Sequence, residues 1–253
     1  MGNAISKKNG LAEAGKKGRF AIIIPAYNHA QGVVDVVEKS LKLNIPVFVV
    51  DDGSTDSTYA RILTIKGICP LHHNQNRGKG AAILTGFAEA SKIAEWAITI
   101  DADGQHNPAD ALNMIQAIPE NKRPIIVGKR EPMVGKDVPW TSRFGRKFSN
   151  FWVLLSGGPG MTDSQSGFRI YPLPEAMNLN VIAKRFQFEV EILIKARWKK
   201  IPVIESPVSV NYAPGTERIS HFRPFIDFLR NTNTFARLIA QRILLSLHTR
   251  NRR

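Results

Sequence analysis

A chain of 253 residues is long enough for one large α/β domain, or for a domain with an appendage. The single cysteine, Cys69, excludes an internal disulfide framework and fits a reducing compartment. A formal net charge of +14 indicates anionic partners: nucleic acid, phosphorylated small molecules or an anionic membrane face. No apolar run approaches the length of a membrane-spanning helix, and the first residues lack the apolar core of a signal peptide.

Strand-like and helix-like segments alternate along most of the chain. Short apolar, β-favouring runs predict strands over residues 20–24, 47–50, 96–100, 124–128 and 202–210, with a short one near 68. Helical patterns cover about 30–43, 58–66, 81–93, 108–118, 142–155 and 186–194. Asn28 is a candidate N-cap of the first of these helices. The alternation predicts parallel βαβ units.

Acidic residues follow two of the predicted strands in the same relative place. Asp101 and Asp103 come after the strand that begins at Trp96, and Asp51 and Asp52 come after an earlier one. Both groups are therefore expected to face the crevice where open α/β sheets bind ligands. Two carboxylates one residue apart repel each other unless a cation joins them, and Mg²⁺ or Mn²⁺ binds carboxylates and diphosphate oxygens together. The alternative is an ordinary Asp-Gly turn.

Three further polar segments leave their interpretation open. The turn Arg77-Gly78-Lys79-Gly80 is neither a dinucleotide fingerprint nor a P-loop, so it is either an anion contact at a helix start or a solvated loop. Residues 163–171 form either the wall of a site or a capped turn. In the helix that follows, Glu189 and Glu191 are expected on the solvated face.

Five ordered motifs together resemble glycosyltransferase family 2. They are IPAYN at 24–28, VDDGSTD at 50–56, NRGKG at 76–80, DADGQ at 101–105 and SGFR at 166–169. The most similar branch is that of the dolichyl- or polyprenyl-phosphate sugar synthases, and the similarity covers residues 20 to 210. It implies an α/β fold of the GT-A type, with a mixed, mostly parallel central sheet between helices. It also implies inverting transfer of a sugar from a nucleotide-diphospho-sugar.

The resemblance assigns the donor site residue by residue. It implies that the base and ribose are held by Pro25, Ala26, Tyr27 and Asp52, and that the donor-binding residues also include Lys79, Asp101 and Ala102. It places a divalent cation on Asp101 and Asp103, with Gln105 completing its shell, which agrees with the expectation from the residues alone. The cation would neutralise the charge that develops on the departing nucleoside diphosphate.

The acceptor side is less strongly specified. Arg130 and Arg169 resemble the family's basic residues near donor or acceptor phosphate. A phosphate acceptor is already ionised and needs no general base, whereas a hydroxyl acceptor needs one, and Asp163 is the first candidate.

The chain also departs from the family pattern. His29 stands where an acidic residue usually follows Tyr-Asn. The branch's Ser-Lys loop is absent, so a cation from Arg218, His221 or Arg223 takes its place, or the acceptor differs. The branch's frequent C-terminal spanning helices are also missing.

The predicted organisation has three parts. Residues 1–19 form a flexible basic arm, residues 20–215 the glycosyltransferase domain, and residues 216–253 a basic amphipathic extension. In the extension, apolar residues recur at helical spacing among arginines. This pattern fits a helix in the membrane interface, or a helix that packs on the core with its arginines in water. The apolar residues are Phe225, Phe228, Phe235, Leu238, Ile239, Ile243 and Leu247.

The leading hypothesis is a metal-dependent glycosyltransferase, cytoplasmic and peripheral on the inner face of a membrane. It would take a GDP- or UDP-sugar and a lipid-linked acceptor. The first alternative is a soluble family 2 enzyme that uses a hydroxyl acceptor on a glycan, lipid or small molecule. From another class, a catalytically silent nucleotide-sugar binder or a nucleic-acid-binding protein fits the charge. The sequence has no zinc spacing, RNA-binding aromatic motif or helix-turn-helix signal, so nucleic acid is not an expected partner.

Overall fold

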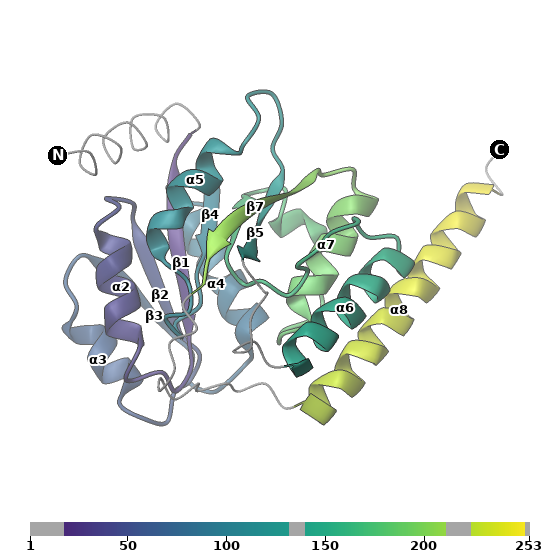
Figure 1. Ribbon diagram of the computed structural model, residues 1–253. Coiled ribbons are helices and arrows are strands. Elements are labelled where there is room, and N and C mark those ends of the chain that lie inside the picture. The colour runs from purple at the N-terminus through teal and green to yellow at the C-terminus, as the bar shows by residue number, and fades with distance from the viewer. Residues whose placement is uncertain (1–17, 132–139, 211–223, 251–253) are drawn as a thin grey trace.

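A seven-stranded sheet forms the centre of the computed structural model, which describes residues 18–131, 140–210 and 224–250 (Figure 1). The strand order is β3-β2-β1-β4-β6-β5-β7. The pairs of β1 with β2 and β4, of β2 with β3 and of β5 with β7 are parallel, whereas β6 runs antiparallel to both neighbours. The expected mixed, mostly parallel sheet is therefore confirmed.

The elements follow the expected alternation. The strands are β1 (Phe20–Ala26), β2 (Val47–Asp51), β3 (Ile68–His72), β4 (Trp96–Thr99), β5 (Ile125–Glu131), β6 (Arg169–Pro172) and β7 (Val203–Ser209). The helices are α2 (Val33–Leu41), α3 (Thr58–Thr64), α4 (Lys79–Ala90), α5 (Ala111–Gln116), α6 (Trp140–Leu155), α7 (Phe188–Trp198) and α8 (Pro224–Arg250). Two short 3₁₀ helices, η1 (Pro108–Asp110) and η2 (Met177–Leu179), complete the described elements.

Strand β1 is buried on both faces because helices cover both sides of the sheet. Ile22 and Ile24 pack with residues of α2 and α5 on one side, whereas Ala21 and Ile23 pack with residues of α4 and α7 on the other. Gly86 lets α4 approach closely, since a Cβ there would lie 2.4 Å from Ile23 Cγ2. The alternating side chains of one strand thus anchor both helical layers and fix the ends of the strands that carry the acidic residues.

The expected N-cap at Asn28 is wrong. Asn28 has a φ of 51°, and α2 begins only at Val33, with Gly32 as its N-cap. The Asn28 side chain is used elsewhere, because its Oδ1 accepts the Thr55 N–H at 2.8 Å and its Nδ2 donates to Thr55 Oγ1 at 3.2 Å. It therefore ties the loop after β1 to the loop after β2, a contact that local capping preference does not foresee.

The expected solvated face of α7 is also wrong. Glu189 is 6% exposed and Glu191 is fully buried, because α7 is enclosed by α4, α6 and α8 as well as by the sheet. Both carboxylates are paired with cations from other elements, which offsets the cost of removing them from water.

The C-terminal helix α8 packs at one end of the molecule, beside α6 and α7 (Figure 1). Phe235 and Leu238 are buried with Val153, Val190 and Ile194, so this part of the extension packs on the core. Ile243 and Leu244 remain 54% and 65% exposed. Among the described residues, none of the helices is long and apolar enough to cross a bilayer. Residues 1–17 of the predicted arm at 1–19 lie outside the described residues, as do the candidate acceptor residues Arg218, His221 and Arg223.

Candidate active site

The carboxyl ends of β2, β1 and β4 lie side by side at one edge of the sheet. Parallel pairing brings Ala26 of β1 opposite Asp51 of β2, and β4 lies on the other side of β1. Asp101 follows β4 at this edge, and Ala102 beside it is 2% exposed. Pro25 and Ala26 end β1 and are buried, whereas Tyr27 just beyond them is partly exposed. The topology therefore brings the predicted donor residues to one edge of the sheet, the edge where open α/β sheets bind ligands.

Asp52 fixes the turn that precedes α4. Its carboxylate is almost fully buried and accepts the backbone N–H groups of Arg77 at 2.9 Å and Gly78 at 2.7 Å. His73 Nδ1 lies 2.7 Å from the same carboxylate. Gly78 has a φ of 101°, and a Cβ there would lie 2.5 Å from the carbonyl oxygen of Lys184. A contact of Asp52 with a donor stays a prediction, and the structure adds this second role in shaping the turn.

Lys79, the first residue of α4, is held between two carboxylates. Its Nζ lies 2.7 Å from Asp101 Oδ1 and 2.5 Å from Glu189 Oε1. Burial alone would lower the pKa of Lys79, but Asp101 and Glu189 outweigh it and raise the pKa, so the ammonium stays charged. Burial alone would raise the pKa of Asp101, but the Lys79 ammonium lowers it, so Asp101 stays ionised. Lys79 is thus a built part of the site and not a solvated charge.

Gly167 forms the wall of the site opposite Lys79. A Cβ at this position would lie 2.4 Å from Asp101 Oδ2 and 2.6 Å from Lys79 Nζ. The Gly167 carbonyl accepts a hydrogen bond from Thr99 Oγ1 at 2.7 Å, which ties the loop to β4. Of the two interpretations left open for residues 163–171, the wall of a site is therefore the one that this loop supports.

The residues after Asp101 fit a divalent cation. Asp103 follows Asp101 by two positions and its side chain is exposed; desolvation of its carboxyl and the negative charge of Asp101 raise its pKa. Asp103 Oδ1 accepts the Gln105 N–H at 3.0 Å, and the neighbouring His106 is 6% exposed. No group of three or more His, Cys, Asp or Glu side chains among the described residues is arranged to hold a metal by itself. Two carboxylates completed by diphosphate and water oxygens are a donor set that suits Mg²⁺.

Asp163 does not fit the role of general base. Its side chain is fully buried, and Arg130 donates to both of its oxygens, through Nε and Nη2, at 2.7 Å. The N–H of Asp163 donates to Glu205, which fixes the backbone as well. A fully buried carboxylate that is paired with a guanidinium in this way is not within reach of a substrate hydroxyl, so the expectation is corrected. Arg130 is 18% exposed and holds Asp163 in place.

Arg169 does not lie where a substrate phosphate can reach it. The side chain is fully buried and donates to the carbonyl oxygens of Ser166, Glu189 and Ser164 at 2.6, 2.7 and 2.9 Å. It therefore braces the loop that carries Gly167 against the start of α7. The expected phosphate contact is corrected because the guanidinium donors are already used by buried backbone acceptors.

Sequence reasoning missed Glu189 and Glu191. Glu189 completes the cage around Lys79, although 110 residues separate the two in the chain. A buried cation at a helix start needs a counter-ion, so the sequence could have indicated that Lys79 has an acidic partner. The sequence does not indicate which carboxylate that partner is.

Known protein families and curated proteins include clear relatives of this chain. The model of glycosyl transferase family 2 matches residues 21–173. A UDP-N-acetylglucosamine–dolichyl-phosphate N-acetylglucosaminyltransferase of Methanococcus voltae is 32% identical over 235 residues, which cover 82% of this chain and 94% of that protein. A dolichol-phosphate mannosyltransferase of Pyrococcus furiosus is 28% identical over 228 residues, which cover 84% of this chain and 62% of that one.

The fold is shared with solved structures. Glucosyl-3-phosphoglycerate synthase of Mycobacterium tuberculosis, in complex with Mn²⁺, UDP-glucose and phosphoglyceric acid, superposes with a TM-score of 0.70 at 16% identity. The likeness covers 91% of this chain and 82% of that one. The fold is that of a GT-A glycosyltransferase, a class of enzyme that uses a nucleotide sugar. The chain belongs to glycosyltransferase family 2, and its most similar curated relatives include dolichyl-phosphate sugar transferases.

Proposed function

We propose that this enzyme transfers a sugar from a nucleotide-diphospho-sugar to the phosphate of a dolichyl- or polyprenyl-phosphate acceptor. Transfer would invert the anomeric carbon, require Mg²⁺ or Mn²⁺, and take place at the cytoplasmic face of a membrane. The observation that supports it most is the edge of the sheet where Asp101, held by Lys79, is followed two residues later by Asp103. The names of the relatives from Methanococcus voltae and Pyrococcus furiosus favour a lipid phosphate as acceptor.

The donor would lie along the ends of β1, β2 and β4. Pro25, Ala26 and Tyr27 would contact the base and ribose, with Asp52 shaping the turn beside them. Asp101 and Asp103, with Gln105 next to them, would hold the divalent cation, which would supply Lewis-acid stabilisation of the leaving diphosphate. Lys79 would keep Asp101 ionised and oriented, because its ammonium bridges Asp101 and Glu189.

A phosphate acceptor fits the site better than a hydroxyl acceptor. A hydroxyl nucleophile must lose its proton to a base within hydrogen-bond reach. Asp163, the first candidate for that base, is enclosed by Arg130. A phosphate oxygen is already ionised at neutral pH and needs no such base. A cationic acceptor role for Arg218, His221 or Arg223 is part of the proposal, although these residues lie outside the described ranges.

The proposal is tested by offering matched acceptors to the full chain. Labelled UDP-N-acetylglucosamine, UDP-glucose and GDP-mannose are incubated with dolichyl phosphate or with dolichol, with Mn²⁺ or with EDTA. We expect one donor to give a labelled lipid only with dolichyl phosphate and only with the metal. Transfer to dolichol, or to a soluble hydroxyl acceptor in place of the lipid phosphate, would support the alternative family 2 enzyme and overturn the proposal. The anomeric configuration of the product, read by NMR, tests inversion.

A further inference from the structure

Exposed apolar side chains are concentrated on two adjacent helices. Eight large apolar side chains are exposed among the described residues, and five of them lie on α6 and α8. They are Phe151 at 59%, Leu154 at 58%, Leu155 at 48%, Ile243 at 54% and Leu244 at 65% exposed. We call these five residues the α6–α8 apolar face. Scattered apolar residues are normal on a protein surface, but a cluster of this kind marks an interaction site.

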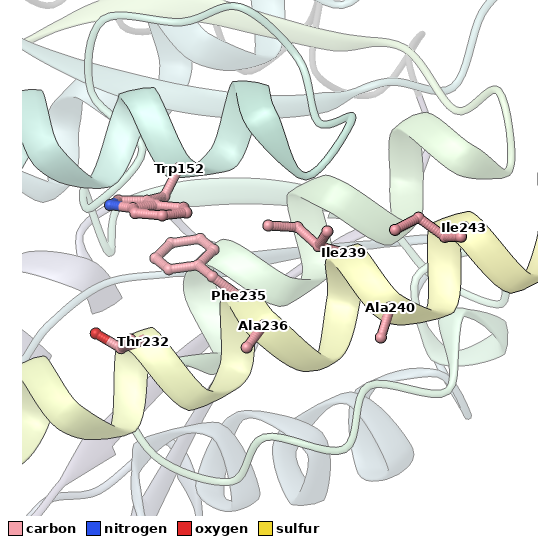
Figure 2. Close-up of a pocket in the computed structure, with 7 residues that line it drawn as sticks. All are labelled: Trp152, Thr232, Phe235, Ala236, Ile239, Ala240 and Ile243. Carbon is pink, nitrogen blue, oxygen red and sulfur yellow. The ribbon is translucent and has the colours of Figure 1, made fainter.

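A groove between the same two helices extends this face. Trp152 of α6 stacks on Phe235 of α8 with ring centroids 6.0 Å apart, and Ile239 and Ile243 continue the lining along α8 (Figure 2). The groove has a volume of about 350 Å³, and the described residues that line it are apolar or aromatic except for Thr232. Arg242 Nη1 donates to the Leu155 carbonyl at 3.1 Å, which brings the end of α6 beside Ile243. The groove and the exposed side chains therefore belong to the same two adjacent helices and share Ile243.

The net positive charge of these two helices favours an anionic lipid surface over a second copy of this chain as the partner. Helix α6 contains Arg143, Arg146 and Lys147 and no acidic residue. Helix α8 contains four arginines and a single acidic residue, Asp227. A symmetric dimer through this face would bring two such pairs of net basic helices together, which costs electrostatic free energy. An anionic lipid surface supplies the opposite charge and accepts apolar side chains at the same time.

We propose that the α6–α8 apolar face lies in the surface of an anionic lipid bilayer. The proposal rests on the proposed function for its biological sense, but its physical basis is separate from the transfer site. The face is preformed, because Phe235 and Leu238 bury the inner side of α8 and Arg237 Nη2 lies 2.6 Å from Glu191 Oε2. Docking therefore places a fixed surface of the enzyme on the leaflet, with no helix folding required.

The test uses the full chain and point variants. Deleting α8 is unsuitable, because it would expose Val190 and Ile194 and leave the buried Glu191 without Arg237. The double variant Leu154→Glu/Leu244→Glu changes two exposed side chains, so it should fold normally. The matched control is Leu63→Glu/Ile93→Glu, whose residues are 56% and 46% exposed on other parts of the fold.

Binding is measured by flotation with vesicles of phosphatidylcholine and phosphatidylglycerol, and with phosphatidylcholine alone, both without any isoprenoid. We expect the native chain and the control to float with the anionic vesicles, and high salt to weaken binding. The test variant should lose about tenfold or more in partition coefficient, because each glutamate removes apolar contact and adds repulsion from the lipid. Its melting temperature and nucleotide binding should equal those of the control.

Three outcomes would overturn the proposal: equal partitioning of test variant and native chain, an equal loss in the control, or no vesicle binding by the native chain. A dimer seen by light scattering that the test variant dissociates, without an effect on vesicles, would assign the face to a second copy. The proposed function can fail separately. Vesicle binding with transfer only to soluble hydroxyls would refute the proposed lipid-phosphate acceptor alone. Transfer to dolichyl phosphate in detergent, without vesicle binding, would refute only the proposal that the α6–α8 apolar face binds the bilayer.

Discussion

Glu191 is the point where α8, α7 and the segment before α7 meet, so it offers a sharp test of how the C-terminal helix stabilises the fold. Its carboxylate is fully buried and accepts from Arg237 at 2.6 Å, from Lys195 at 2.9 Å, and from the N–H groups of Ile182 and Ala183 at 3.2 and 3.0 Å. In Glu191→Gln, either amide orientation directs an NH₂ group at a backbone N–H. The change also leaves two cations without their counter-ion.

We expect Glu191→Gln to be strongly destabilising. Removing one partner of a buried ion pair costs about 3–5 kcal/mol, and the exposed part of Arg237 places the expected loss near the lower end, about 3 kcal/mol. For a chain of this size that corresponds to a fall in melting temperature of about 6–12 °C. Circular dichroism measures the shift, with the exposed Glu38→Gln as the control. A shift below about 2 °C would refute the account of Glu191 as a structural ion-pair centre.

Glu191→Gln should also weaken binding of the nucleotide sugar at the donor site. Lys184 follows the two residues whose N–H groups Glu191 holds, and its carbonyl accepts the Ala81 N–H at 2.9 Å. The carbonyl of Lys184 also lies against Gly78, in the turn that positions Lys79. We therefore expect a raised KM for the nucleotide sugar in Glu191→Gln, measured below its melting temperature. An unchanged KM would show that the segment keeps its place without the carboxylate.

The remaining predictions concern the acid limb of stability and the transfer site. Burial acts to raise the pKa of Glu191, but Arg237, Lys195 and two N–H groups lower it below the ordinary value of 4.5. The ionised carboxylate therefore stabilises the fold above that pH, and this stabilisation is lost as pH falls through the folded pKa. Glu191→Gln should weaken the decrease of melting temperature at acid pH. Asp103→Ala should abolish transfer with an unchanged circular dichroism spectrum, and near-normal turnover would contradict the metal assignment. Lys79→Met should lower kcat by about 10²-fold or more, because Asp101 and Glu189 then repel each other, and an unchanged kcat would exclude this role. Gly167→Ala should raise the Mn²⁺ concentration needed for half-maximal rate, because its Cβ would displace Asp101, whereas Gly160→Ala, with open space around it, should not.

Local sequence signals predicted much of the architecture. Apolar runs and turn residues located the strands of the first half within one or two residues, and the βαβ alternation predicted parallel pairing, because both depend on neighbours in the chain. Strand β6 was not predicted, and neither was its antiparallel direction, since strand direction in a sheet depends on the route of the connecting segments. The motifs gave the family and the edge where the acidic residues gather.

The roles of individual charged residues were predicted less well. Asp163 and Arg169 were expected to act on substrate, yet both are sealed inside the fold by Arg130 and by three backbone carbonyls. Glu191 was expected in solvent because its partner, Arg237, lies 46 residues further along the chain and local pattern does not reveal the pairing. A motif identifies a residue type and a position, but whether the side chain faces substrate or backbone depends on what packs over it.

The sequence alone therefore determined the order of the elements, the family and the carboxylate-lined edge, because periodicity, turn chemistry and motif spacing are local properties. The tertiary structure decided which charges are catalytic candidates and which are braces, and it divided α8 into a buried side at Phe235 and Leu238 and an exposed one at Ile243 and Leu244. The reason is physical: burial and ion pairing depend on neighbours that only the folded chain brings together.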